Sequence, residues 1–180
     1  MGSLYQHNTF HNRWINFFIQ ERLERQVRLA RDRGNISSAD VSAFERLYKK
    51  LEEIFPETKP SLVHGDLWSG NFMINENGLP SLIDPAVYYG HPEVDIAMST
   101  LFGGFADSFY ETYNQSNPLE KGWQQRLDYY NLYPLMIHVN LFGESYLRAV
   151  RRICLLYTSD AADDLLCVDP GGRRILKKNT

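Results

Sequence analysis

The stretch SLVHGDLWSGNFMI, residues 61–74, is the starting point for predicting the fold. An apolar run typical of a β-strand leads into a polar loop containing His64, Asp66 and Asn71, and a second apolar run follows. Asp66 and Asn71 are separated by four residues, a spacing at which one loop can hold both a base and a metal ligand where phosphoryl groups are bound. The stretch therefore predicts a strand–loop–strand unit that presents polar side chains to a ligand.

A third polar group follows a short turn. Asn77-Gly78 favours a hairpin, and the sequence LIDP, residues 82–85, comes directly after the predicted turn. Asp84 is therefore expected at the end of a paired strand. The pattern predicts that Asp66, Asn71 and Asp84 converge on one cation.

Three motifs resemble those of the fructosamine (ketosamine 3-) kinase family, within the larger group of protein-kinase-like and aminoglycoside phosphotransferase-like enzymes. They are HGDLWSGN at 64–71, IDPA at 83–86 and GHPEVDIAM at 90–98. Shorter matches at 6–8, 14–18, 132–135 and 142–143 extend the resemblance over roughly residues 2–153. Only the carboxyl-terminal lobe of such kinases is matched.

The resemblance implies a mostly helical α+β fold, with ATP and Mg²⁺ as cofactors. It also implies transfer of the γ-phosphoryl group to the sugar 3-hydroxyl of a ketosamine. Asp66 is the expected base, and Asn71 and Asp84 are the expected magnesium ligands. His64 and Asp95 are expected to anchor the catalytic loop. The alternative for Asp95 is an acidic residue in the first turn of a helix, stabilised by the helix dipole.

Trp68 lies two residues after the expected base, in a polar loop that contains glycine. An indole in that place can form a flat apolar wall for a sugar ring, so Trp68 is the candidate substrate-binding residue. Burial beneath the loop is the alternative interpretation.

Composition limits the class of protein. The chain has 180 residues, 43% of them hydrophobic, which fits one globular domain. A net charge of −3 gives no electrostatic reason to expect nucleic acid or a membrane surface as a partner. Two cysteines, and no signal-peptide pattern after Met1, favour a reducing, cytoplasmic location. The expected partner is a ketosamine-modified protein or a small-molecule amine; the sequence leaves the oligomeric state open.

Two helices are predicted before residue 61. Thr9 is expected to cap the first, which Gly34 ends, and Ser37 or Ser38 is expected to cap a second that ends before Pro56. Arginines in the first helix alternate with acidic residues, which favours a solvated face over a basic binding face. These arginines are Arg22, Arg25, Arg28, Arg31 and Arg33.

After Asp84, residues 85–92 are expected to form a loop, and Pro92 suits the first turn of the next helix. A further helix is predicted over 106–113. From Trp123 onward apolar residues recur at helical spacing, with expected interruptions near Pro134 and Gly143.

The sequence contains no glycine-rich phosphate loop and no lysine in a Val-Ala-x-Lys-like strand. We therefore expect residues 1–154 to be a kinase-like carboxyl-terminal lobe without its amino-terminal lobe, and inactive alone. Residues 155–180 do not continue the family pattern. They resemble translated sequencing-adapter DNA, so we expect a non-native tail; a short helix over 160–166 with a basic tail is the alternative.

Three other functions compete with this prediction. A related small-molecule kinase, of the aminoglycoside or choline kinase type, shares the loop chemistry. A non-catalytic helical interaction module requires only the helices. A metal-dependent hydrolase would need a dinuclear site, for which the candidate ligands are His64, Asp66, Asp84, His91 and Asp95.

Overall fold

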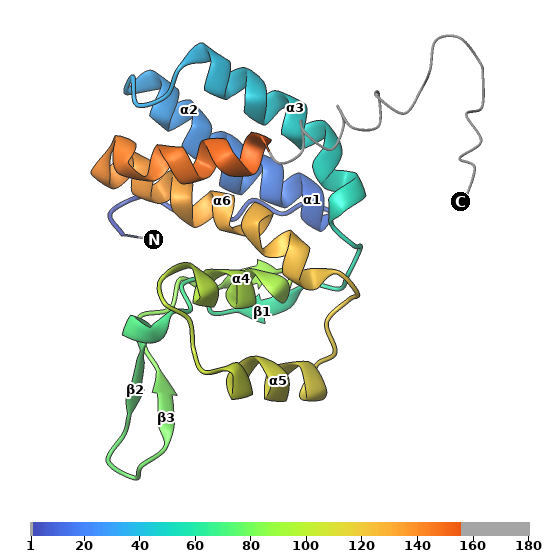
Figure 1. Ribbon diagram of the computed structural model, residues 1–180, viewed down its shortest axis with the longest axis vertical. Helices are drawn as coiled ribbons and strands as arrows, with labels where there is room; N and C mark the ends of the chain where they lie inside the picture. The colour runs from blue at the N-terminus through green and yellow to red at the C-terminus, as the bar shows by residue number, and fades with distance from the viewer. Residues whose placement is uncertain (1, 156–180) are drawn as a thin grey trace, which may run out of the picture.

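The computed structural model describes residues 2–155. Helices dominate it, and two small antiparallel sheets complete an α+β fold. Figure 1 shows α1, α2, α3 and α6 together in a helical layer, with β1, α4 and α5 on one side of it and the β2–β3 hairpin projecting from the end. The tail expected at 155–180 lies, apart from Leu155, outside the described residues.

The first long helix consists of α1 (Trp14–Phe17), a π-helical turn (Phe18–Leu23) and α2 (Glu24–Asp32). The prediction that Thr9 caps it is wrong, because the helix begins at Trp14 and its N-cap residue, Arg13, makes no side-chain cap. Residues 5–11 are irregular since contacts with distant parts of the chain hold them out of the helix. The predicted end is confirmed: Gly34 follows the helix with φ of +73°.

Helix α3 (Ser38–Ile54) begins and ends where the sequence predicts. The Ser37 hydroxyl accepts a hydrogen bond from the Asp40 amide, and the Asp40 carboxylate accepts one from the Ser37 amide. Phe55 is extended and Pro56 follows it. This capping box fixes the start of α3.

Strand β1 (Ser61–Val63) delivers the chain to the polar loop and pairs antiparallel with β4 (Tyr88–Gly90). The prediction of a loop throughout 85–92 is therefore wrong at 88–90. Pro85, Gly90 and Pro92 are local turn signals, whereas the pairing of Ser61 with Gly90 is a long-range contact that local sequence does not reveal. Strands β2 (Phe72–Ile74) and β3 (Pro80–Leu82) form the predicted hairpin, with Gly78 at φ of +74° in its turn.

Helices α4 (Glu93–Leu101) and α5 (Asp107–Ser116) follow the strands. Helix α6 (Trp123–Phe142) then continues past Pro134, contrary to the interruption predicted there, and ends before Gly143 as predicted. Residues 130–137 are all buried, so packing on several sides outweighs the hydrogen bond that proline cannot donate. A 3₁₀ turn (Glu144–Tyr146) and a helix over 147–155 continue the chain.

The core lies around α6, which packs on α4 and α2. Its aromatic centre includes Phe18, Phe55 and Tyr130; the rings of Phe55 and Tyr130 stack with centroids 4.2 Å apart. Across residues 2–155, no helix combines the length and the apolar character that crossing a bilayer requires.

Candidate active site

The loop after β1 is fixed by one carboxylate on α4. Asp95 accepts hydrogen bonds from the backbone amides of His64 (2.7 Å) and Gly65 (2.8 Å), one to each carboxylate oxygen. Burial raises the pKa of Asp95, although the two amide hydrogen bonds oppose that effect. Residues 64 and 65 are therefore tied to the first turn of α4, 30 positions further along the chain.

Asp66 follows directly in this loop and is half-buried. Burial raises its pKa, with the nearby imidazole of His64 acting in the opposite direction. The Asn71 side chain is buried and its Nδ2 donates to the Asp66 carbonyl oxygen at 2.9 Å. This bond ties Asn71 to the backbone of the expected base.

Asp84 reaches the same region through the hairpin. The Ile83 amide donates to the Asn71 carbonyl oxygen at 3.0 Å, so the main chains of residues 71 and 83 are adjacent. Asp84 is exposed and has φ of +50°, the left-handed conformation that few residues other than glycine adopt. The amide oxygen of Asn71 and the carboxylate of Asp84 are the hard oxygen donors that Mg²⁺ prefers, so this donor set fits the ion.

His64 connects the two segments. Its ring Nε2 lies 3.1 Å from the Ile83 carbonyl oxygen, and its own carbonyl oxygen accepts from the Ala86 amide at 2.8 Å. The structure thus places His64 between the loop that contains Asp66 and the segment that contains Asp84.

Trp68 is half-buried, and its indole folds over Gly70. A Cβ at Gly70 would come within 2.3 Å of the indole, so a side chain there would displace the ring. The ring also meets Phe102 edge-on, with centroids 6.2 Å apart. Trp68 is therefore neither fully in the core nor free on the loop surface.

The ligands expected for a dinuclear hydrolase do not assemble. His91 is buried between the rings of Trp14 and Tyr130, and its Nδ1 accepts from the Glu93 amide. Within residues 2–155 no three His, Cys, Asp or Glu side chains are arranged as a metal-binding cluster. The hydrolase alternative therefore lacks its ligand set in the part of the chain that the structure describes.

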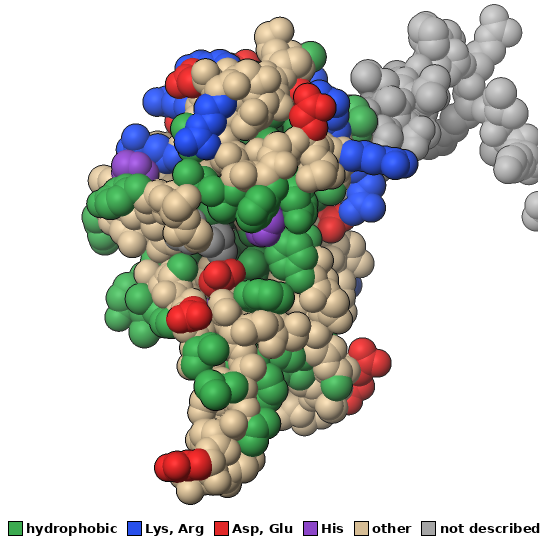
Figure 2. All heavy atoms as spheres, turned by 90° about the vertical axis from the view of Figure 1, so that its left-hand side faces the viewer, with side chains coloured by type: hydrophobic (Ala, Val, Ile, Leu, Met, Phe, Trp, Pro, Cys, Tyr) green, Lys and Arg blue, Asp and Glu red, His purple; other side chains and the backbone are tan. Residues whose placement is uncertain are grey.

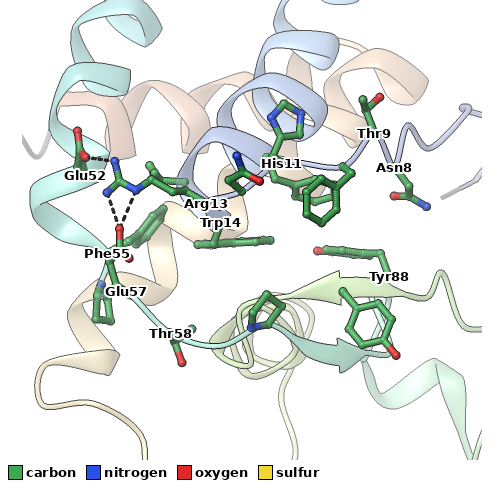
Figure 3. Close-up of a pocket in the computed structure, with 17 residues that line it drawn as sticks. Asn8, Thr9, His11, Arg13, Trp14, Glu52, Phe55, Glu57, Thr58 and Tyr88 are labelled. Atoms are coloured by element: carbon green, nitrogen blue, oxygen red, sulfur yellow. Dashed lines mark hydrogen bonds and ion pairs between the residues drawn. The ribbon is translucent and has the colours of Figure 1, made fainter.

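Two hollows lie near the strands. A cleft of about 1120 Å³ borders His64, Leu67 and Asp95 and extends between the hairpin and α5. A second cavity of about 360 Å³ lies between residues 8–17, the end of α3 and β4, and none of the predicted site residues lines it (Figure 3). Arg13 bridges Glu52 and Glu57 at its edge. Of the predicted site residues, His64 and Asp95 line the larger cleft, whereas Asp66, Trp68, Asn71 and Asp84 line neither hollow.

Sequence reasoning missed two buried arginines. Arg22 was expected on a solvated face but is fully buried. Arg126 forms a bidentate ion pair with Glu93, with contacts of 2.9 and 2.5 Å, which joins α6 to α4. The position of Arg22 between Phe18 and Leu23, two core residues of the same helix, could have indicated that it is buried. The sequence around Arg126 contains no such indication of burial.

A strand–loop–hairpin unit pinned to a following helix, with two aspartates and an asparagine, has the organisation of a phosphotransferase catalytic segment. The family model described as fructosamine kinase matches residues 1–157. The chain belongs to the fructosamine kinase family.

Individual relatives agree with this assignment. A probable ketoamine kinase of Enterococcus faecium is 47% identical over 150 residues, covering 81% of this chain and 53% of that protein. The chloroplastic protein-ribulosamine 3-kinase of Arabidopsis thaliana is 41% identical over 148 residues, covering 81% and 45%. A crystal structure assigned as a fructosamine-3-kinase of Thermobifida fusca superposes with a TM-score of 0.82 at 34% identity, covering 88% of this chain and 56% of that one. The chain spans about half the length of the relatives it matches.

Proposed function

We propose that this chain is the carboxyl-terminal lobe of an ATP-dependent ketosamine 3-kinase. The reaction is transfer of the γ-phosphoryl group of ATP to the sugar 3-hydroxyl of a ketosamine on a protein or a small amine. The observation that carries the proposal is the anchoring of one loop to α4 and to the hairpin, which brings the main chains around residues 66, 71 and 83 next to one another and supports a shared site for Asp66, Asn71 and Asp84. The names of the relatives, ketoamine kinase and ribulosamine 3-kinase, support the acceptor class.

Asp66 orients the acceptor hydroxyl and takes its proton as the phosphoryl group arrives. Partial burial raises its pKa, which makes its carboxylate a better proton acceptor than an exposed aspartate. Asp95 and His64 hold the loop. The carboxylate of Asp66 is therefore already positioned before the reaction, and no conformational entropy is lost in fixing it at that stage.

Asn71 and Asp84 are the residues that would hold Mg²⁺, and His64 fixes the segment that carries Asp84. The ion, when bound, neutralises charge on the ATP phosphates. Trp68 forms an apolar wall on the acceptor side of the loop in this proposal. Its half-burial, over Gly70 and beside Phe102, leaves part of the indole available to a sugar.

The chain alone is inactive in this proposal. Phosphoryl transfer requires the nucleotide to be held in line with its acceptor, and that positioning is worth roughly 7–11 kcal/mol of the barrier. The sequence supplies no glycine-rich loop and no phosphate-binding lysine of the kinase type. The part of the chain that matches covers only about half the length of each relative, so in this proposal the nucleotide is held by a part of the whole enzyme outside the matched residues.

The experiment that tests the acceptor side compares Trp68→Ala with the unmodified sequence, in a two-lobed version made by joining the upstream half of the E. faecium kinase. The Michaelis constant for a ketosamine should rise several-fold while that for ATP stays the same. Equal changes in the two constants would show that Trp68 supports the loop and does not contact the acceptor.

A further inference from the structure

Residues 6–8 lie against the segment that contains Asp84, although about 80 positions separate them in the chain. Gln6 Nε2 donates to the Ala86 carbonyl oxygen at 3.1 Å. The Ala86 amide in turn donates to the His64 carbonyl oxygen. A Cβ on Gly65 would lie only 2.2 Å from the Ala86 oxygen, so the two backbones are in close contact. Ala86 is thus held between the amino-terminal segment and the catalytic loop.

The buried Arg22 holds the amino-terminal segment in place. It donates to the His7 carbonyl oxygen and, at 2.7 Å, to Asn8 Oδ1. Its guanidinium lies over the rings of Tyr88 and Phe17, 4.1 and 4.4 Å from their centroids. Figure 3 shows Asn8 and Tyr88 on the same side of the smaller cavity. Aromatic faces and carbonyl acceptors together compensate for burying this charge. We call residues 6–8 with Arg22 the strap.

The strap completes the set of contacts that fix residues 83–86. At one end of this segment Ile83 bonds to Asn71 and to the His64 ring; at the other end Ala86 bonds to His64 and to Gln6. Asp84 lies between these ends in a left-handed conformation that costs a non-glycine residue about 1 kcal/mol or more. The contacts on both sides of Asp84 fix the backbone that holds it in that conformation.

We propose that Gln6, held by Arg22, is a positioning residue for Asp84 and so for the divalent cation at Asn71 and Asp84. Gln6 touches neither the cation nor the substrate; it acts through the Ala86 carbonyl. The inference rests on the proposed function, because it concerns the same cation site.

The test replaces Gln6 with methionine, which has similar length and no donor, and uses Gln124→Met as the matched control. Gln124 is exposed on α6. Mn²⁺ alone is the probe, and paramagnetic broadening of the amides of residues 71 and 83–86 reports its binding to the 180-residue chain. Asp84→Asn identifies the signal that belongs to this site. Hydrogen exchange at the Ala86 amide and the melting temperature are measured on the same samples.

Gln6→Met should weaken Mn²⁺ binding roughly tenfold, the effect typical of losing a group that orients a metal ligand. Exchange at Ala86 should also rise, while Gln124→Met changes neither quantity. Unchanged Mn²⁺ affinity in Gln6→Met overturns the positioning role of Gln6, even if exchange at Ala86 rises. That result does not contradict the cation site itself. Absence of Asp84-dependent broadening in the unmodified chain overturns the cation site of the proposed function and the positioning role with it.

Discussion

Asp95 makes the contact on which the candidate site depends most. Its two carboxylate oxygens accept from the amides of His64 and Gly65, so truncation to alanine leaves two inward-facing donors without partners. Asp95→Ala should lower the free energy of unfolding by about 2–4 kcal/mol. Urea titration followed by circular dichroism measures the loss.

Asp107→Ala is the matched control, because Asp107 is an exposed acidic residue in the first turn of α5. A first-turn acid that interacts only with the helix dipole contributes about 0.3–1 kcal/mol. Equal losses in the two variants would mean that Asp95 is a dipole-stabilised acid and does not anchor the loop.

His91 makes stability depend on pH. Burial lowers its pKa to about 4 from a usual 6.5. Between these values the unfolded chain binds a proton that the folded chain does not, so the free energy of unfolding falls as the pH drops. The contribution of His91 is fully present above pH 6.5 and falls by up to about 3 kcal/mol by pH 4.

His91→Asn keeps an acceptor for the Glu93 amide and removes the titrating ring. Urea titrations at pH 7 and pH 4.5 should show a smaller pH-dependent loss for His91→Asn than for the unmodified chain. Identical losses would show that groups other than His91 cause the acid sensitivity.

At the scale of elements, the Glu93–Arg126 pair joins α4 to α6. Glu93 is fully buried and Arg126 is 8% exposed, so removing one partner leaves the other charge uncompensated. Arg126→Met should lower the free energy of unfolding by about 3–5 kcal/mol. Glu93→Met combined with Arg126→Met should cost less than Arg126→Met alone, because no buried charge remains. A double variant that is less stable than the single one would contradict this account of the pair.

Elements with strong local signals were predicted well. The capping box at Ser37, the hairpin turn at Gly78 and the helix end at Gly34 each depend on residues within a few positions, and the structure confirms all three. The motif at 64–71 contains the candidate residues Asp66 and Asn71. The main chain at residue 71 lies next to that at residue 83, one position before Asp84.

Elements set by distant contacts were not predicted. Strand β4 exists because β1 pairs with it, and the start of α1 is delayed because Gln6 and Asn8 bond to residues elsewhere in the chain. Arg22 follows the same rule: its acidic neighbours predicted a solvated face, whereas aromatic rings from β4 and α6 cover it. The pattern of neighbouring residues does not reveal partners that are distant in the sequence.

At the scale of the whole molecule, apolar side chains are exposed along the strands. Leu62 and Tyr89 form a cross-strand pair and are 64% and 69% exposed, and five residues of the β2–β3 hairpin are also open. The hairpin residues are Phe72, Met73, Ile74, Leu79 and Leu82. Figure 2 shows hydrophobic side chains over the middle of the molecule and along the projecting hairpin, while basic side chains gather over the helices. Exposed apolar side chains in this number on two neighbouring sheets favour contact with another protein surface.

The chain alone should therefore self-associate, with the strand surface as the contact. Leu62→Thr combined with Tyr89→Thr should lower the average mass in sedimentation velocity and leave the helical signal intact. Phe142→Ser is the control, since Phe142 is 62% exposed at the end of α6 and belongs to neither sheet. A similar decrease in mass for the control would exclude the strand surface as the contact.

The most direct test of the central claim measures ATP-dependent phosphorylation of a ketosamine by three proteins. They are the 180-residue chain, its two-lobed version, and the two-lobed version with Asp66→Asn. We predict no turnover by the chain alone and turnover by the two-lobed protein. Asp66→Asn should reduce that turnover by about 10²–10⁴-fold without changing the melting temperature. Turnover that survives Asp66→Asn while the melting temperature falls would contradict the claim that Asp66 is the base of a kinase site.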